Sequence, residues 1–501
     1  MERRKFLQTI SLGSLGFAAS LSVPIRAWSF FQKTTSLSTA KQRLSWLAYR
    51  SASFEGPATI TEIEGSIPAS IRGTLYRIGP GSKETFGREL THFFDGDAYL
   101  SALHISDSRV QLQSAFVGTP ERAAEQAAKK MLYTEFGTAC EGHSRGYKYP
   151  PNINIQTIGG KLLALSESSW PTALDPESLH ATGTWNFGGS LAVHTTFTAH
   201  PKLDPVTGDV YSYGITQALS PELKVFRLAK GSEQLTQVAS HSLGGFFPIH
   251  DCLLTENYMV FLVAPLKVKL LGAALGQSPI ADLLEYDGSK PFRIILVRKD
   301  GSASPLEIES SPGGLAFHHC NAWEESGQLH FDSVVMPDDS AYAMFENWSA
   351  DVMPPSPNSW ITRFSIDLAT MKLRSRTQIS DGVPTDFPGV NSHLLGKPMS
   401  HYHLLEAAFG NEDPLAFNTL ACWDLEARSA KRITVSARQC LGEPLYVPDD
   451  KNAWILHLGY DADRDETFLD IRKEISLELV ARAWLGRYLP LGFHGSFIPR
   501  A

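Results

Sequence analysis

The feature that most constrains this chain is a long succession of short apolar segments separated by turn signals. From about residue 55 onward, segments such as Gly73–Ile78, 153–158 and 258–263 have the composition that favours strands. Dipeptides such as Asp95-Gly96 mark turns between them. This pattern predicts an all-β fold and leaves a sandwich, a barrel and a propeller as alternatives.

Segments with helical character are few. The best example covers residues 120–131, where Pro120 stands in the first turn and Lys129 and Lys130 are expected in the last turn. Helices are therefore expected to contribute little to the body of the fold.

Composition sets further bounds. The chain has 501 residues, of which 43% are hydrophobic, and we assign residues 56–501 to one domain because large all-β folds often form a single unit. The net charge of −8 is well mixed in sign, which argues against a nucleic-acid partner. The five cysteines are scattered and lack Cys-x-x-Cys spacing, so neither a disulfide framework nor a thiolate metal site is expected.

Residues 1–30 are typical of a targeting segment. Arg3-Arg4 precede Phe6-Leu7 and a moderately apolar stretch that ends near Pro24. The paired arginines resemble the twin-arginine export signal, so we expect export to the periplasm or an equivalent lumen, with or without membrane association. A basic tail and an uncleaved anchor are the alternatives. Residues 31–55 are assigned to a linker or N-terminal arm.

Four of the sixteen histidines stand in distinctive contexts. They are His200 in Thr-Ala-His-Pro-Lys, His250 in Phe-Pro-Ile-His-Asp, His318 in Ala-Phe-His-His-Cys and His494 in Gly-Phe-His-Gly-Ser-Phe. These motifs, in this order, resemble the four iron-ligand motifs of the carotenoid cleavage oxygenase family. The resemblance runs from Glu64 to the C-terminus and includes segments 73–81, 94–97 and 442–444.

The resemblance implies a site and a fold. It assigns one Fe(II) per chain to the four histidines, and it assigns Glu167, Asp386 and Glu443 to carboxylates that hold the ligating imidazoles. The family usually has Glu where this chain has Asp386, so the shorter side chain needs either an inward shift of the backbone or a bridging water. The implied fold is a seven-bladed β-propeller with a loop and helix cap over a central metal site.

The spacing of these seven positions corroborates that fold. Successive positions lie 33 to 68 residues apart, and a four-stranded blade takes roughly 40–50 residues, more with loops. One inward-pointing group per blade would converge on the central axis. Because the positions were chosen by motif, the spacing supports the propeller without proving it.

The chemistry of such a site is coherent. Neutral imidazoles suit a ferrous ion, and four of them leave two octahedral positions open, for O2 and for water. A carboxylate that accepts the N–H of a ligating imidazole fixes its tautomer and raises its basicity. Three carboxylates around one divalent ion would leave a local charge near −1.

The reaction that the resemblance implies is oxidative cleavage of a carbon–carbon double bond of a carotenoid or apocarotenoid, an apolar polyene, with O2 to give two carbonyl products. We keep three alternatives open. The first is cleavage of a stilbene-type phenylpropenoid at the same iron site. The second is an isomerase that uses the same site. The third is a propeller that binds a ligand and has no enzymatic activity. A monomer is expected.

Two further features have competing interpretations. The apolar stretch 262–284 contains Lys267 and Lys269, which suits a peripheral membrane contact, but it is equally compatible with a strand followed by a packed helix. His401 and His403 would share one strand face, where packing is favoured over a second metal site. Adjacent residues of a strand point to opposite faces, so His319 would point away from the face of His318.

Overall fold

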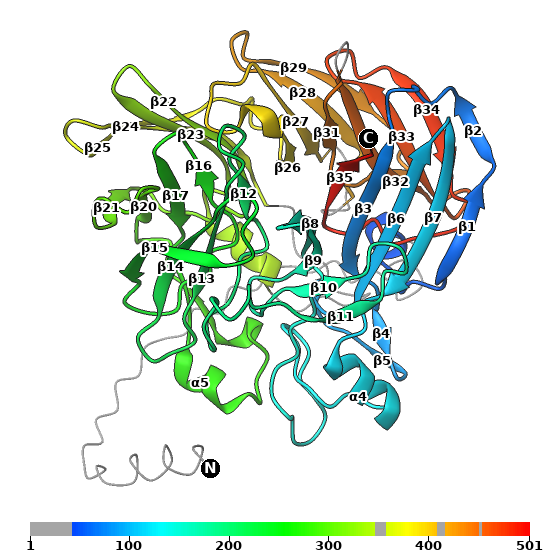
Figure 1. Ribbon diagram of the computed structural model, residues 1–501, viewed down its shortest axis with the longest axis horizontal. Helices are drawn as coiled ribbons and strands as arrows, with labels where there is room; N and C mark the ends of the chain where they lie inside the picture. The colour runs from blue at the N-terminus through cyan, green and yellow to red at the C-terminus, as the bar shows by residue number, and fades with distance from the viewer. Residues whose placement is uncertain (1–42, 346–356, 408–415, 450–452, 501) are drawn as a thin grey trace, which may run out of the picture. The chain divides into compact units, whose positions relative to one another are not determined.

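The structure is a computed structural model that describes residues 43–345, 357–407, 416–449 and 453–500. The predicted signal segment 1–30 and the first part of the predicted arm, residues 31–42, lie outside the described residues. The described residues form seven larger sheets arranged around a common axis (Figure 1). The expected all-β fold and the seven-bladed propeller are therefore confirmed.

The seven blades are built from strands that mostly follow one another along the chain. The first blade has the order β1 (Gly56–Ile60), β7 (Arg109–Phe116), β6 (Ala98–Ser106), β3 (Gly73–Pro80) and β35 (His494–Pro499). The second has β11 (Ala181–Thr184), β10 (Thr172–Leu174), β9 (Lys161–Leu165) and β8 (Asn154–Ile158). The third has β12 (Lys202–Leu203), β13 (Val210–Ile215), β14 (Glu222–Leu228) and β15 (Leu235–Ser242).

The remaining blades continue this order around the axis. The fourth has β16 (Leu253–Leu254), β17 (Tyr258–Val263), β20 (Phe292–Arg298) and β21 (Leu306–Ser310). The fifth has β22 (His319–Glu325), β23 (Gln328–Val335), β24 (Trp360–Asp367) and β25 (Lys372–Gln378). The sixth has β26 (Thr385–Gly389), β27 (His401–Glu406), β28 (Thr419–Asp424) and β29 (Ser429–Thr434). The seventh has β30 (Gln439–Leu441) and β31 (Leu445–Val447) beside β32 (Trp454–Asp461), followed by β33 (Glu466–Lys473), β34 (Leu479–Trp484) and β2 (Glu62–Gly65).

Strand composition follows position within the blade. The middle strands pack against neighbouring blades on both faces, so β17 and β32 are buried along their whole length and read as continuous apolar runs. The outer strands β25 and β29 have exposed residues along most of their length. The clusters of buried apolar side chains therefore lie between blades, where the sheets pack face to face.

The two ends of the chain close the ring. Strand β35 pairs with β3 in the register Gly73↔Pro499 to Ile78↔His494, so the C-terminal strand completes the first blade. Strand β2 pairs with β34, which places an N-terminal strand in the last blade. Each closure joins segments about 400 residues apart, so the ring of blades is complete only when both ends of the chain have paired.

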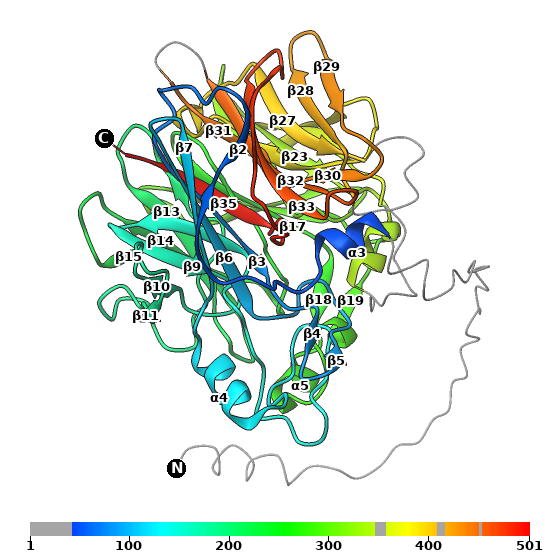
Figure 2. The same ribbon diagram turned by 90° about the vertical axis from the view of Figure 1, so that its right-hand side faces the viewer.

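Short elements on one side of the propeller form the cap (Figure 2). They are the hairpin β4 (Glu84–Thr85) and β5 (Arg88–Glu89), the pair β18 (Leu266–Val268) and β19 (Leu284–Tyr286), α4 (Pro120–Ala128), α5 (Leu270–Leu275), and the 3-10 helices η1 (Ala281–Leu283) and η2 (Asp339–Phe345). Elsewhere, α3 (Leu44–Ala48) packs into the core, and η3 (Ser392–Leu394) precedes β27.

The predicted helix at 120–131 is present as α4, but it ends at Ala128. The Thr119 hydroxyl accepts the Arg122 N–H at 3.2 Å, and Pro120 stands in the first turn. Lys129 adopts a left-handed conformation with φ 53° and ends the helix. The expectation that Lys129 and Lys130 lie in the last turn was therefore wrong.

Candidate metal centre

Each blade contributes one of the seven predicted side chains. His200, His250 and His318 lie just before the innermost strands β12, β16 and β22, and His494 opens β35. The carboxylates come from the other three blades: Glu167 follows β9, Asp386 lies in β26, and Glu443 connects β30 to β31. The propeller therefore brings together residues that are up to 327 positions apart in the sequence.

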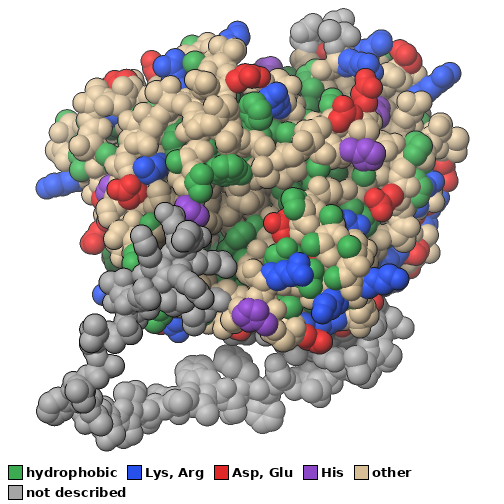
Figure 3. Space-filling view, turned by 60° about the horizontal axis from the view of Figure 1, so that its bottom comes forward, with side chains coloured by type: hydrophobic (Ala, Val, Ile, Leu, Met, Phe, Trp, Pro, Cys, Tyr) green, Lys and Arg blue, Asp and Glu red, His purple; other side chains and the backbone are tan. Residues whose placement is uncertain are grey.

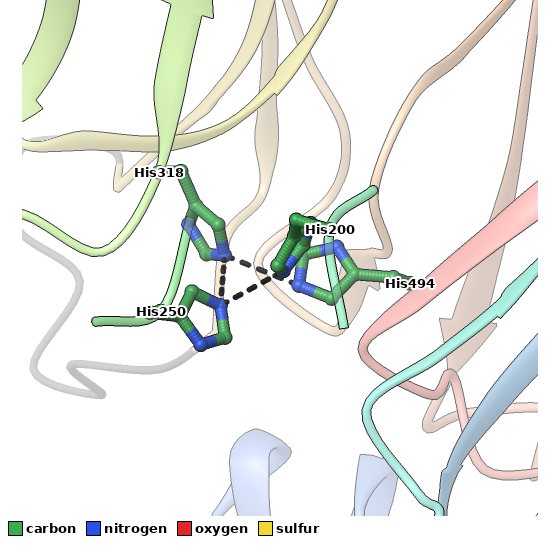
Figure 4. A group of neighbouring side chains, drawn as sticks. All are labelled: His200, His250, His318 and His494. Carbon is green, nitrogen blue, oxygen red and sulfur yellow. Dashed lines mark hydrogen bonds between the residues drawn. The ribbon is translucent and has the colours of Figure 1, made fainter. Parts of the chain in front are cut away.

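The four histidine rings point at one another across the axis (Figure 4). The Nε2–Nε2 distances are 3.0 Å between His200 and His250, 3.3 Å between His250 and His318, and 3.1 Å between His318 and His494. One ligand atom from each of the four lies within 4.8 Å of the others. Among the described residues, no other group of histidine, cysteine and carboxylate side chains has this arrangement.

Three of these rings are held from behind by a carboxylate. His250 Nδ1 lies 2.8 Å from Glu167 Oε1, His318 Nδ1 lies 2.6 Å from Asp386 Oδ1, and His494 Nδ1 lies 2.7 Å from Glu443 Oε1. The structure thus brings together all seven residues that the sequence singled out.

The donor set fits a cation. An ionised carboxylate only accepts hydrogen bonds, so each of the three Nδ1 atoms carries the ring proton and donates it. The Nε2 atoms of these neutral rings then present lone pairs toward a common point, where they cannot hydrogen-bond to one another. A metal ion at that point would satisfy them all, as in other carboxylate–histidine–metal arrangements.

Burial favours the neutral imidazole that ligation needs at His200 and His494, whereas at His318 burial is outweighed by Asp386, which raises the pKa of that ring. Burial lowers the pKa of His200 well below its ordinary value, and it lowers the pKa of His494 to about 4 despite the neighbouring Glu443. Burial alone would raise the pKa of Glu167 and Asp386, but the adjacent imidazoles outweigh it and hold both pKa values below their usual range.

Asp386 reaches His318 directly. Its Oδ1 also accepts the Phe387 N–H at 2.8 Å, and Phe387 adopts φ 53° where the pairing of β26 with β27 changes register. The bulge lies at this residue, and the shorter side chain makes the contact to His318 directly, at 2.6 Å. Of the two possibilities that the sequence left open, this direct contact excludes the bridging water.

Two charged residues near the centre were missed by the sequence analysis. Arg77 forms a short ion pair with Glu443, so three carboxylates, one guanidinium and one divalent ion would balance to zero. The expected local charge near −1 was wrong because it omitted Arg77. A buried arginine inside segment 73–81, flanked by apolar residues, was the available signal.

Asp251 is the second of these residues. Its Oδ1 accepts from Lys202 Nζ at 2.7 Å, and its Oδ2 accepts the His319 N–H at 3.1 Å. Lys202, Asp251 and His319 belong to three successive blades, and each lies within two residues of a ligand histidine. Asp251 therefore links the segments that carry three of the four rings.

The remaining histidines have other partners. His319 Nδ1 lies 2.9 Å from Ser333 Oγ, away from the His318 ring position. His401 Nε2 lies 3.5 Å from Asp424, whereas His403 Nε2 lies 3.0 Å from the Glu474 carbonyl. His401 and His403 therefore do not form a second metal site.

A cavity of about 260 Å³ lies on the cap side of the four histidines. Blade residues and cap residues line it together, and apolar groups dominate. Its aromatic lining consists of Tyr49, Phe93, Phe94, Phe136, Tyr149, Tyr213, Phe246, Phe317, Phe345, Phe387, Phe417 and Phe493. The Phe387 ring lies 5.0 Å from the His318 ring, centroid to centroid, so the apolar wall continues up to the metal centre.

Segment 262–284 contributes part of the cavity wall through Ala264, Leu266, Val268, Ile280 and Leu284. Its residues form the end of β17, β18, α5 and η1, and Leu262, Leu266 and Val268 are buried. Leu271 on α5 is 79% exposed, and Lys267, Lys269 and Ala274 are exposed as well. Within the described part of the chain, no helix is long and apolar enough to span a bilayer.

Fold and site together define a seven-bladed propeller with a four-histidine metal centre on its axis. The family profile described as retinal pigment epithelial membrane protein matches residues 49–499. The chain therefore belongs to this family, which is the carotenoid cleavage oxygenase family that its motifs resemble.

The relatives include enzymes with different substrates. The chain is 32% identical to apocarotenoid-15,15'-oxygenase of Synechocystis sp. over 479 residues, which cover 90% of this chain and 96% of that protein. It is 33% identical to resveratrol cleavage oxygenase 1 of Aspergillus fumigatus over 474 residues, or 89% and 93% of the two chains. The structure of cobalt-substituted Synechocystis apocarotenoid oxygenase matches with a TM-score of 0.84 at 28% identity and covers 94% of this chain and 100% of that one.

Proposed function

We propose that the protein is an Fe(II)-dependent oxygenase that cleaves a carbon–carbon double bond of a carotenoid or apocarotenoid with O2, giving two carbonyl products. The observation that carries the proposal is the convergence of four imidazole Nε2 atoms at the wall of an apolar, aromatic-lined cavity. The similarity to apocarotenoid-15,15'-oxygenase over most of the chain supports the substrate class.

The protein residues have three tasks in this reaction. His200, His250, His318 and His494 would hold the ion, and the carboxylates behind three of them fix the ring orientations. When bound, Fe(II) supplies the activation of O2. The aromatic lining would bind the polyene, present one double bond to the centre and exclude water.

Product analysis tests the proposal. Iron-loaded protein is incubated with a panel of carotenes, apocarotenals and hydroxystilbenes under labelled O2, and the carbonyl products are identified by mass. Labelled carbonyl pairs from a polyene would support the proposal. An isomerised product without label would indicate the isomerase alternative. Iron-loaded protein that leaves the whole panel unchanged would favour a propeller that only binds a ligand.

Stilbene cleavage is the second candidate because the resveratrol-cleaving relative is 33% identical. The polar part of the cavity bears on it. Among the described residues that line the cavity, Lys148 is the only lysine or arginine. Its Nζ lies 2.7 Å from Asp97, 2.8 Å from Glu125 and 3.3 Å from Glu135. With three carboxylates around it, Lys148 offers little charge to a phenolate, so the geometry favours the polyene.

One hydroxyl in the cavity would suit a polar end group. Tyr149 lines the cavity, and its hydroxyl makes no hydrogen bond with the described residues. Burial raises its pKa above the ordinary value, so the hydroxyl is a neutral donor. We propose that it binds the terminal oxygen of an apocarotenoid.

We propose further that the cap face contacts a membrane, from which an apolar substrate would be drawn. Hydrophobic side chains border a hollow on this face (Figure 3), and the exposed Leu271 lies close in sequence to Lys267 and Lys269. Co-sedimentation with anionic vesicles tests this. Leu271→Glu should reduce the bound fraction, and unchanged binding would argue against α5 as the contact.

We also propose that residues 1–30 direct export by the twin-arginine route. The pair Arg3-Arg4 before an apolar stretch supports this, and the five cysteines are free thiols, so no disulfide depends on folding after export. Replacing both arginines with lysine should block delivery across the membrane. Normal export of that variant would indicate another kind of signal or an anchor.

A further inference from the structure

Arg77 lies where the ring of blades closes. It is on β3 opposite Gly495 of β35, and its guanidinium reaches into the seventh blade. One terminal nitrogen forms a short hydrogen bond with Glu443 Oε2, and the other donates to the Phe493 carbonyl at 2.9 Å. Arg77 therefore binds both the Glu443 carboxylate, which contacts the His494 ring, and the backbone carbonyl of the residue before His494.

The environment of Arg77 is costly for a charge. Its side chain is 1% exposed, and its Nε has no hydrogen-bond partner among the described residues. Buried ion pairs of this kind seldom add net stability, because desolvation offsets the attraction. An incompletely satisfied buried guanidinium is better explained by a task at the site than by a contribution to folding.

The neighbouring backbone makes room for this side chain. A Cβ atom at Gly495 would lie 2.0 Å from the Tyr76 carbonyl oxygen and 2.8 Å from Arg77 Cδ. Glycine next to the ligand His494 therefore allows β35 to approach β3 closely with the arginine side chain passing between them.

Arg77 distinguishes His494 from the other ligands. Glu443 Oε2 accepts hydrogen bonds from Arg77 and from the Gly495 N–H at 3.1 Å, so both of its oxygens are fixed. By contrast, Glu167 Oε2 has no partner among the described residues. Of the three carboxylates, Glu443 alone pairs with a Lys or Arg in the described part of the chain.

We propose that Arg77 is a positioning residue of the metal centre. It fixes the Glu443 carboxylate and, through it, the ring plane of His494, and its charge makes the metal-loaded centre neutral. The proposal rests on the four-histidine metal site and is independent of the substrate and of the reaction.

Cobalt(II) is the probe that tests it, because its visible absorption reports ligand geometry. The Co²⁺ dissociation constant, the absorption bands and the thermal midpoint are measured for wild type, Arg77→Met and Arg77→Lys. Arg77→Met should weaken Co²⁺ binding by about 10–100-fold, the usual effect of losing a partner behind a ligand. Arg77→Lys keeps the charge and loses the two-pronged geometry, so we expect a smaller loss, together with shifted bands.

The control is Arg472→Met. Arg472 is a comparably buried arginine of the seventh blade, with a 5% exposed side chain and an ion pair to Asp470 at 2.5 Å. Its loss should lower the thermal midpoint and leave Co²⁺ affinity and the bands unchanged. In a Glu443→Gln background, Arg77→Lys should have little further effect, because the carboxylate through which it acts is gone.

Three results would overturn the proposal. The first is wild-type affinity and bands in Arg77→Lys, which decides the matter even if Arg77→Met does not fold. The second is an equal effect of Arg77→Lys with and without Glu443, which would exclude action through that carboxylate. The third is a loss of Co²⁺ affinity in Arg472→Met as large as in Arg77→Met. Wild-type protein that binds no Co²⁺ would instead overturn the metal centre itself.

Discussion

Shortening or lengthening the side chain at position 386 should weaken metal binding in both directions. Asp386 Oδ1 lies 2.6 Å from His318 Nδ1 and 2.8 Å from the Phe387 amide. Both distances are already at the short end for hydrogen bonds. A glutamate side chain is longer by one methylene, about 1.5 Å. With the backbone where it is, its carboxylate could not keep both contacts.

The magnitude follows from what each variant removes. Asp386→Ala loses the partner of His318, which typically costs about 10–100-fold in metal affinity, or about 1.4–2.8 kcal/mol. Asp386→Asn keeps an acceptor oxygen without the charge, so it should lose less, because charge-assisted hydrogen bonds are roughly twice as strong as neutral ones. Asp386→Glu must rotate its carboxylate away from at least one partner, so it should bind metal more weakly than wild type.

The assay is iron content per chain after equilibration with a competing chelator, with circular dichroism as the check on folding. Asp424→Ala is the matched control, because Asp424 pairs with His401 at 3.5 Å and does not contact the metal centre. Equal iron content in wild type and all three position-386 variants would remove Asp386 from the centre. A tighter site in Asp386→Glu would refute the argument that the longer side chain cannot keep both contacts.

Three further predictions concern other positions. Asp251→Asn should lower both iron content and the thermal midpoint, because Lys202 keeps its partly buried charge without a counter-ion; unchanged iron content would mean that Asp251 does not order the ligand segments. Tyr149→Phe should raise KM about 2–12-fold for polyenes with an oxygen-bearing end group, the net value of one hydrogen bond, and leave KM for a hydrocarbon end unchanged; equal effects on both would refute the hydroxyl contact. Burial raises the pKa of Glu135 from 4.5 to about 7, so the folded state favours the neutral acid, and stability falls as pH rises from about 4.5 through 7. Glu135→Gln should therefore lower the thermal midpoint, relative to wild type, by more at pH 5.5 than at pH 8; a difference independent of pH would count against the shifted pKa.

The ligand motifs were readable from sequence because each is local. A histidine such as His494, together with the residues beside it, carries its own signature, and the order of the motifs along the chain adds to it. The blades were less visible, since short strands alone do not separate a propeller from a sandwich. The spacing of the motifs favoured the propeller only after the motifs had been recognised.

The charge at the centre was not readable in the same way. Arg77 and Glu443 are 366 positions apart and meet only because β35 returns to the first blade. Likewise, the amphipathic reading of 262–284 could not separate a membrane-facing surface from a cavity wall. Burial of Leu262 and Leu266, with exposure of Leu271, follows from how the cap packs on the fourth blade.

The pairing of carboxylates with histidines does not follow a simple rule of adjacency. His318 and His494 take their carboxylates from a neighbouring blade, the sixth for His318 and the seventh for His494. His250, in the fourth blade, instead takes Glu167 from the second, across the blade that carries His200. Among the described residues, no carboxylate contacts the His200 ring, and the His200 backbone N–H donates to Thr198 Oγ1 at 2.9 Å. His200 is therefore the ligand whose ring depends most on the packing around it, because no carboxylate contact fixes its tautomer.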